Sequence, residues 1–174
     1  IMADGTLKVG TITNSAGSGN ITIGSGVTLN SNTPIFYGYL SSSQTVTSGT
    51  TTLVAIDTVE FDSNSNWDSS AYKWTPDEAG KYLVYGSVRC TGSTAVQISM
   101  SAIYKNGSEH AECQIDFRTA NTDAVNGGNV FVQSVISMNG TSDYLQLYGR
   151  NLGTTIFNGD GDRRTFFGAY KLGA

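Results

Sequence analysis

The stretch from Val59 to Cys90 constrains the fold more than any other part of the chain. A short apolar segment ends at Asp62, and a polar loop then leads into the turn Thr75-Pro76-Asp77-Glu78-Ala79-Gly80. Proline fixes its own φ and glycine gives backbone freedom at little cost, as a turn requires. The run from Gly80 to Tyr85 is rich in aromatic and β-branched residues, which suit a buried strand. The stretch therefore predicts two strands joined by a long polar connection.

The composition indicates an all-β protein and excludes two classes of partner. Glycine accounts for 21 of the 174 residues, Ser, Thr and Asn are abundant, and strong helix formers are few. The formal net charge is −4. Phosphate binding needs a positive stripe and none appears, so we expect no nucleic-acid partner. No apolar run approaches the roughly 20 residues that span a membrane, so we expect no membrane insertion. The first residues lack the basic and apolar segments of a secretory signal, which leaves export by that route unsupported.

Two strands that flank Asn106-Gly107 are each predicted to have one apolar face. Asn-Gly between two alternating segments is a strong hairpin signal. The residues that alternate with mostly polar neighbours are Ile98, Met100, Ala102 and Tyr104 in the first strand and Ala111, Cys113, Ile115 and Phe117 in the second. This hairpin is therefore assigned to an outer sheet with one dry face and one wet face.

The two cysteines, Cys90 and Cys113, both fall at positions predicted to face inward. Free cysteine packs as a small hydrophobe, so two buried thiols are favoured over a disulfide, which stays open as an alternative. Neither residue belongs to a Cys-x-x-Cys pair, so a metal or redox site has little support.

Four further segments are apolar on both faces. They are residues 35–40, 82–88, 130–132 and 166–172. A sheet built from them would place one face in the core of a sandwich and would leave a second apolar face to be covered. The chain offers no helix for this purpose, and the simplest cover is another copy of the same sheet. The alternative is that Tyr37, Tyr39 and Tyr85 lie half-exposed, which tyrosine tolerates.

Several motifs resemble those of the C1q and tumour-necrosis-factor-like jelly roll. The stretch from Val59 to Cys90 carries Val-x-Phe-Asp, aromatic-x-Pro and Ala-Gly-x-Tyr in the order of this family. Further resemblances follow at residues 35–39, 104–107, 138–148 and 165–170, the last with Phe-x-Gly. Together they cover residues 34–174. The resemblance implies an antiparallel ten-strand jelly-roll sandwich that assembles as a homotrimer around an axis.

The strand patterns and the resemblance together assign side chains to the core and to the trimer interface. The expected core residues are Phe36, Phe61, Tyr82, Phe166 and Gly168. The expected interface residues are Tyr37, Tyr39, Leu83, Tyr85, Phe131, Phe167 and Ala169.

Residues 1–33 are predicted to form a separate, extended N-terminal arm. Short apolar pairs recur with period two at Leu7 and Val9, Ile21 and Ile23, and Val27 and Leu29. Such short pieces cannot bury an apolar face alone. One interpretation is a flexible linker, and the other is an extended docking or shaft segment that is buried by sister chains or by a larger assembly. The segment from Leu7 to Gly19 resembles the starts of structural appendage proteins of bacteriophages.

No pattern of catalytic residues occurs, so we expect a protein that is not an enzyme. His110 is the only histidine, and its place beside Glu109 at a strand start is typical of a solvated residue. Nucleophile elbows and phosphate-binding glycine loops are absent from the sequence. Asn158, Asp160 and Asp162 have the spacing of a calcium loop, but no distal Glu follows and Arg163-Arg164 adds opposing charge. We therefore expect no cofactor, with calcium as the one alternative.

These features predict a non-enzymatic trimeric structural or recognition knob on a phage particle. Residues 1–33 would attach it to other virion proteins in a head or tail fibre, and loops would contact a host-surface glycan or protein. The receptor-binding candidates are Trp67, Asp68, Asp160 and Arg163. Trp67 offers either a flat ring for sugar stacking or a buried anchor. The alternative function is a secreted C1q-like lectin, adhesin or matrix protein. The expected location is therefore the virion or, for the alternative, the extracellular space.

Overall fold

The structure is a computed structural model that describes residue 25 and residues 33–92, 95–118 and 126–173. The chain divides into two units, Ile1–Asn32 and Thr33–Ala174. Nearly all of the predicted arm, residues 1–33, lies outside the described residues. Its role as an attachment segment therefore stays a prediction.

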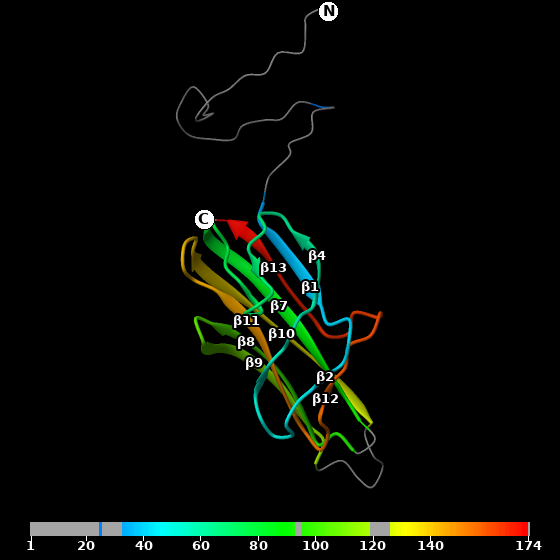
Figure 1. Ribbon diagram of the computed structural model, residues 1–174. Coiled ribbons are helices and arrows are strands. Elements are labelled where there is room, and N and C mark those ends of the chain that lie inside the picture. Colours follow the sequence, from blue (N-terminus) through cyan, green and yellow to red (C-terminus); the bar gives the residue numbers. More distant parts are fainter. Residues whose placement is uncertain (1–24, 26–32, 93–94, 119–125, 174) are drawn as a thin grey trace, which may run out of the picture. The chain divides into compact units, whose positions relative to one another are not determined.

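The described residues form strands joined by turns and loops, without a helix (Figure 1). The long strands are β1 (Ile35–Tyr39), β4 (Thr58–Asp62), β7 (Ala79–Thr91), β8 (Ile98–Lys105), β9 (Ser108–Asp116), β10 (Gly127–Asn139), β11 (Leu145–Leu152) and β13 (Phe166–Gly173). The two-residue strands are β2 (Gln44–Thr45), β3 (Thr52–Leu53), β5 (Trp67–Asp68), β6 (Lys73–Trp74) and β12 (Ile156–Phe157). The predicted all-β architecture is confirmed, with short extra strands beside the long ones.

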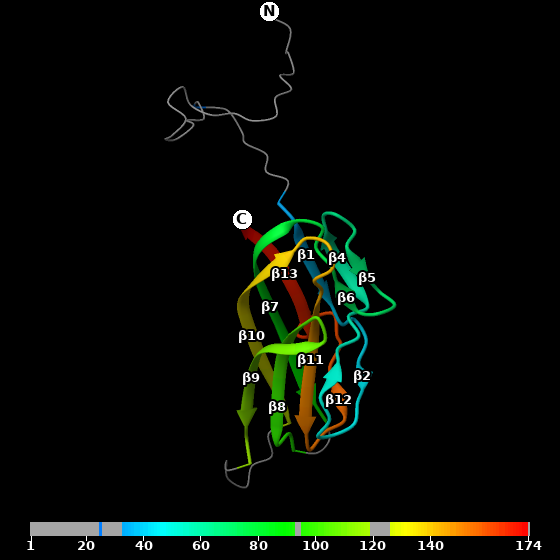
Figure 2. The same cartoon turned by 90° about the vertical axis from the view of Figure 1, so that its left-hand side faces the viewer.

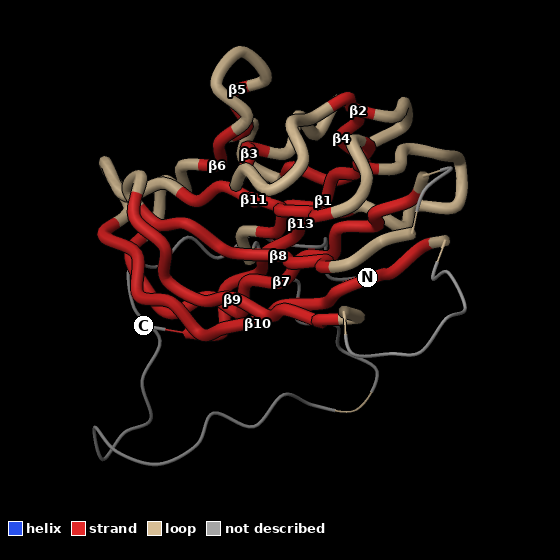
Figure 3. Tube along the Cα trace, turned by 90° about the horizontal axis from the view of Figure 1, so that it is seen from below, coloured by secondary structure: helices blue, strands red, loops and turns tan. Residues whose placement is uncertain are grey.

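The strands build two antiparallel sheets that face each other as a sandwich (Figure 2). The first, the β7 sheet, has the order β2-β12-β7-β13-β1-β4, with β10 also paired to β7. The second, the β8 sheet, has the order β5-β6-β11-β8-β9, with β3 paired to β11. The four segments predicted to share a sheet, now β1, β7, β10 and β13, are together in the β7 sheet. The end strands β9 and β10 lie side by side at one edge of the sandwich (Figure 3).

The core lies between the sheets and is built from large rings. The largest fully buried side chains include Trp74, Tyr82, Phe36, Phe157 and Phe167. Phe36 stacks on Trp67 with ring centroids 4.8 Å apart and on Trp74 at 5.7 Å, and it meets Phe167 edge-on at 5.7 Å. Burial raises the pKa of the Tyr82 hydroxyl to about 12. Phe36 and Tyr82 are therefore core residues, as predicted.

The facing of β13 is the reverse of the predicted one. Phe167 and Ala169, expected at the trimer interface, are fully buried in the core. Phe166, expected in the core, lies opposite Tyr39 and projects from the outer face of the β7 sheet. Side chains alternate between the two faces of a strand, so an error of one residue exchanges the whole set.

Two neighbours hold β13 in this register. The buried Thr165 hydroxyl donates to the Asn158 carbonyl oxygen at 2.7 Å and accepts the Arg89 backbone N–H at 3.1 Å. Gly168 is buried as predicted, but it lies beneath the Tyr85 ring on the outer face. A Cβ at Gly168 would be 2.5 Å from that ring. The Tyr85 ring therefore leaves room only for glycine at position 168, and this position lies on the outer face of the sheet.

Phe61 is the second correction to the predicted core. Its side chain is 56% exposed, and it lies opposite Tyr37 on the outer face of the β7 sheet. The inward position of β4 is taken by Asp62. Its carboxylate accepts the Trp67 backbone N–H at 2.8 Å and the Trp74 indole N–H at 3.4 Å. Because Asp62 serves the two tryptophans, Phe61 must point the other way.

The two cysteines are free, but they differ in environment. Cys90 is fully buried, and burial raises the pKa of its thiol. Cys113 is exposed, which corrects the prediction that it is buried. It belongs to β9, the end strand of the β8 sheet, where an inward-facing side chain has no strand beyond it for cover.

A serine from the β8 sheet is inserted into the hydrogen-bond ladder of the β7 sheet. Val88 in β7 and Val130 in β10 are cross-strand partners. Ser101 Oγ accepts the Val88 backbone N–H at 2.9 Å and donates to the Val130 carbonyl oxygen at 2.7 Å. Ser101 is fully buried. This hydroxyl bridges two backbone groups of the β7–β10 pair and ties the sheets together through the core.

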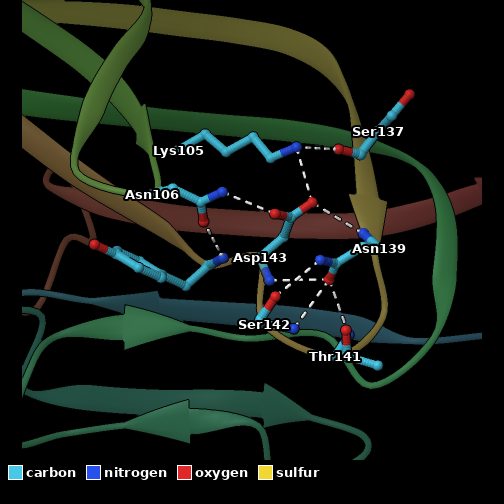
Figure 4. Close-up of polar contacts among 8 residues, drawn as sticks. Lys105, Asn106, Ser137, Asn139, Thr141, Ser142 and Asp143 are labelled. Atoms are coloured by element: carbon cyan, nitrogen blue, oxygen red, sulfur yellow. Dashed lines mark hydrogen bonds and ion pairs between the residues drawn. The ribbon is translucent and has the colours of Figure 1, made fainter.

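A polar cluster joins the β8–β9 turn to the β10–β11 turn (Figure 4). Asp143 accepts from Lys105 Nζ at 2.8 Å, from Asn106 Nδ2 at 2.8 Å and from the Asn139 backbone N–H at 3.0 Å. Bonding by Lys105 first, and by Asn106 next, lowers the pKa of Asp143. Asn106 and the following Gly107 both have positive φ, as the predicted Asn-Gly hairpin requires. This end of the sandwich is held by side chains as well as by strand pairing.

Candidate self-association face

Apolar side chains from five adjacent strands project from the outer face of the β7 sheet. The strand register places these side chains in neighbouring rows across β4, β1, β13, β7 and β10. We call this set the aromatic face; its members are Tyr37, Tyr39, Phe61, Leu83, Tyr85, Phe131, Val135, Phe166 and Tyr170. The interface residues Tyr37, Tyr39, Leu83, Tyr85 and Phe131 fall within it, whereas Phe167 and Ala169 lie beneath it in the core.

Phe166 is at the centre of the aromatic face. Its ring centroid lies 5.9 Å from Tyr37, 6.2 Å from Tyr85 and 6.3 Å from Phe131. These separations and tilts fall in the range in which aromatic rings attract one another. Burial raises the pKa of both Tyr37 and Tyr85, with Glu60 as the second cause for Tyr37. The cluster is therefore uncharged and preformed within one chain.

Much of the aromatic face is open to solvent in a single chain. Phe131 is 48% exposed and Val135 is 53% exposed, and Phe61 and Tyr170 are also exposed. Isolated apolar residues on a surface are ordinary, but a contiguous patch of this kind marks an interaction site. Chemically, the face can bind another apolar surface, and it offers no acid, base or nucleophile within its aromatic centre.

An ion pair forms one rim of the aromatic face. Arg163, in the loop between β12 and β13, donates from Nε to Glu60 Oε1 at 3.1 Å, and its guanidinium lies 5.0 Å over the Tyr39 ring. Cations over tyrosine rings are attracted by the ring electrons. Arg163 also has a positive φ of 54°, which is uncommon outside glycine. This predicted receptor-binding residue is therefore anchored beside the aromatic face.

A second exposed apolar surface lies at the adjacent edge of the sandwich. Ile115 is 40% exposed and Cys113 is exposed, and both belong to the end strand β9. β9 lies beside β10, which carries Phe131 and Val135 of the aromatic face. The aromatic face and the β9 edge are thus two apolar surfaces that meet along β10.

Trp67 and Asp68, two receptor-binding candidates, have structural partners. The Trp67 ring is half-buried and stacks on Phe36, so it acts as an anchor between loop and core. Asp68 Oδ1 accepts from Ser70 N, Ser70 Oγ and Ala71 N at 2.9, 2.6 and 3.1 Å. These bonds lower the pKa of Asp68, the Ser70 hydroxyl first. The pair belongs to the β5–β6 hairpin, whereas Asp160 and Arg163 belong to the β12–β13 loop.

Of the three calcium candidates, Asp160 and Asp162 are paired with an arginine, whereas the side-chain oxygen of Asn158 is buried and has no hydrogen-bond partner among the described residues. Arg164 forms ion pairs with Asp160 at 3.1 Å and with Asp162 at 2.5 Å. The Asn158 carbonyl oxygen accepts the Thr165 hydroxyl. Within the described ranges, no group of three or more His, Cys, Asp or Glu residues has a metal-binding arrangement. These contacts give a structural role to the acidic turn, and Arg164 offsets part of its negative charge.

Sequence reasoning missed part of the aromatic face and its rim. Val135, Tyr170 and Glu60 had no assigned role, although Val135 and Tyr170 alternate with buried neighbours and so could have been placed.

His110 is exposed on β9, as a solvated residue should be. The part of the chain that the structure describes contains no helix that is long and apolar enough to cross a membrane.

Comparisons with known proteins identify the fold. No protein-family model and no curated protein matches the sequence. Among solved structures, Eiger TNF from S. frugiperda superposes with a TM-score of 0.60 at 12% identity, covering 80% of this chain and 92% of the other. Murine APRIL gives 0.60 at 11% identity and 80% and 99% coverage. The globular domain of zebrafish complement 1qA gives 0.59 at 10% identity and 80% and 97% coverage. The fold is therefore a jelly roll of the TNF and C1q type.

Proposed function

We propose that the jelly roll is a non-enzymatic homotrimer that serves as a structural or recognition knob. The observation that carries this proposal is the aromatic face, centred on Phe166 and contiguous over five strands. Burying such a face on association contributes roughly 25 cal/mol per Å² of apolar area, before the cost of association is subtracted. A second copy of the same chain is the simplest partner for this face, because it is present wherever the protein is made.

The two apolar surfaces favour a head-to-tail arrangement of copies. If aromatic faces met each other, the assembly would close at two copies and the β9 edge would stay exposed. If the β9 edge of one copy, with Cys113 and Ile115, packs on the aromatic face of the next, every copy buries both surfaces. A head-to-tail contact forms a closed ring when its rotation allows. The resemblance to C1q and TNF-like domains supports a ring of three.

We place this trimer on a phage particle, joined to other virion proteins through residues 1–33. The support is the resemblance of Leu7 to Gly19 to the starts of phage appendage proteins. The second candidate is an extracellular recognition protein. The similarity to Eiger TNF, APRIL and complement 1qA favours it, because these comparison proteins come from animals. In both cases the exposed loops are the surfaces available to a host-surface glycan or protein.

Light scattering coupled to size-exclusion chromatography tests the trimer. At micromolar concentration the wild-type chain should have the mass of three copies. Phe131→Glu should give a folded smaller species, because the ring is half-exposed in one chain and a charge there opposes burial. The control Gln97→Glu changes an exposed residue outside the aromatic face and should stay trimeric. A wild-type chain that is a stable monomer would contradict the proposal.

Mass spectrometry of purified particles tests the location. The phage proposal expects peptides of this chain in particles at a constant ratio to other structural proteins. Recovery of the chain only as a free protein in the medium would favour the extracellular alternative instead.

A further inference from the structure

We propose that Asn126 is a site of spontaneous deamidation, and that the fold protects the other Asn-Gly pairs of the chain. Asn-Gly occurs at Asn106, Asn126, Asn139 and Asn158. Glycine after asparagine leaves the backbone nitrogen sterically open, so all four pairs are reactive in an unfolded chain. The four asparagines differ in whether the fold restrains the side-chain amide or the glycine nitrogen. Asn126 is the one for which we infer reaction in the folded chain. This inference is independent of the proposed trimer.

The reaction needs two groups that are free to meet. The backbone nitrogen of the glycine loses its proton and attacks Cγ of the asparagine. The Cγ–Nδ2 bond breaks and ammonia leaves, which gives a succinimide ring. Water then opens the ring at either carbonyl and yields aspartate or isoaspartate. A fold slows this chemistry if it holds the side-chain amide or the glycine nitrogen in place.

The side-chain amides of Asn106 and Asn139 are both held. Asn106 Nδ2 donates to Asp143 at 2.8 Å, and Asn106 Oδ1 accepts the Tyr144 backbone N–H at 2.9 Å. Asn139 Oδ1 accepts three backbone N–H groups, from Thr141, Ser142 and Asp143, at 3.0, 3.0 and 2.9 Å. Figure 4 shows both asparagines inside the cluster around Asp143. Attack at either Cγ would break this network.

At Asn158 the attacking nitrogen is the group that is held. The Gly159 backbone N–H donates to Ser43 Oγ at 3.2 Å, and the same hydroxyl donates back to the Gly159 carbonyl oxygen at 3.3 Å. Gly159 packs closely on the backbone of Ser42, since a Cβ there would lie 2.4 Å from Ser42. The glycine therefore has no room to swing toward the Asn158 side chain.

Asn126 has neither restraint. Its side chain is exposed and, among the described residues, has no hydrogen-bond partner. Its neighbour Gly127 is the first residue of β10 and lies opposite Thr91 of β7. β10 pairs with β7 and with no other described strand, so one side of its backbone is an open edge.

The strand register directs the Gly127 N–H to that open edge. Arg89 turns its backbone away from β10, because its N–H bonds Thr165 and its carbonyl oxygen accepts from Asn158. Backbone groups alternate in direction along a strand, so Thr91 also turns away from β10. Its cross-strand partner Gly127 then makes no ladder bond with it. Among the residues that the structure describes, this is the one Asn-Gly pair in which neither the side-chain amide nor the glycine nitrogen has a hydrogen-bond partner.

Deamidation at Asn126 changes the start of an edge strand. A neutral amide becomes a carboxylate, so each modified copy gains one negative charge. The isoaspartate product also lengthens the backbone by one atom immediately before β10. Both products persist, because the loss of ammonia is not reversed in water. The protein therefore accumulates charge variants as it ages.

Peptide mapping by mass spectrometry after incubation of the folded chain at mildly alkaline pH tests this inference. Deamidation should accumulate at Asn126 at least about tenfold faster than at Asn106, Asn139 or Asn158, since a local opening that costs about 1.4 kcal/mol slows a reaction about tenfold. In concentrated urea the four sites should react at similar rates, which shows that the fold causes the difference.

Two variants separate the causes. Asn126→Ser should abolish the early charge variant seen by ion-exchange chromatography. Asp143→Ala should raise deamidation at Asn106 and Asn139 and leave Asn126 unchanged, because it removes the acceptor that organises both turns. Equal rates at Asn126 and Asn106 in the folded wild-type chain would overturn the inference. An unreacted Asn126 under conditions where the urea sample reacts would overturn it as well.

Discussion

Individual side chains contribute to the stability of the sandwich by bonding the two sheets to each other. Ser101 is a small polar residue that the predicted alternation of its strand placed on the wet face, yet the structure buries it toward the β7 sheet. Its hydroxyl satisfies two buried backbone groups at once, the Val88 N–H and the Val130 carbonyl. Buried polar backbone groups are costly when they are left without partners. A residue that looks unremarkable in the sequence therefore connects the two sheets and holds the edge strand β10.

Replacing Ser101 with alanine should be strongly destabilising for so small a change. Ser101→Ala leaves the Val88 N–H and the Val130 carbonyl without their shared partner, so we expect a loss of about 1–3 kcal/mol in the free energy of unfolding. Urea denaturation measures it. Ser137→Ala changes an exposed serine on β10, the strand whose Val130 carbonyl oxygen Ser101 holds, and serves as the control, with an expected effect within about 0.5 kcal/mol. Equal effects of the two changes would show that the bridge carries no stability.

At the scale of elements, the sequence predicts which segments are strands better than it predicts their facing. Phe36 was placed correctly in β1, where the structure alternates buried and outward side chains, although the apolar residues of β1 also occupy both faces in the sequence. In β13, apolar residues occupy both faces, so periodicity cannot distinguish Phe166 from Phe167. The facing there depends on Thr165 and on the Tyr85 ring above Gly168, and these contacts come from distant segments. The inward role of Asp62, which turns Phe61 outward, is of the same kind.

The close approach of Tyr85 to Gly168 predicts a coupled effect of one methyl group. Gly168→Ala puts a Cβ 2.5 Å from the Tyr85 ring. The ring must move away from Phe166, so we expect a lower melting temperature, a loss of about 1–3 kcal/mol in stability, and weaker self-association. Gly173→Ala, at the end of the same strand, meets nothing within 4 Å and should be neutral. Calorimetry and light scattering on both variants check this, and an unaltered Gly168→Ala protein would refute it.

The whole molecule combines a closed core with open outer surfaces. In the sequence, the buried apolar residues of the described chain run from Pro34 to Ala169. Among the described residues, most of the large apolar side chains that a single copy leaves exposed lie on the aromatic face or on the edge strand β9. The composition and motifs were enough to predict the sandwich and the existence of an apolar outer face. They could not locate the rim at Glu60 and Arg163, because that pair joins residues 103 positions apart in the sequence.

The division of the chain after Asn32 leads to a prediction about the entire protein. A chain of residues 33–174 retains Pro34, which is buried and whose carbonyl oxygen accepts the Lys171 N–H at 3.1 Å. It also retains every buried apolar residue, so it should fold with a nearly unchanged melting temperature and remain trimeric. If residues 1–33 attach the knob, the shortened chain should fail to join particles in a complementation assay scored by mass spectrometry. Aggregation of the shortened chain would make the arm part of the fold, and its incorporation into particles would place the attachment surface on the jelly roll.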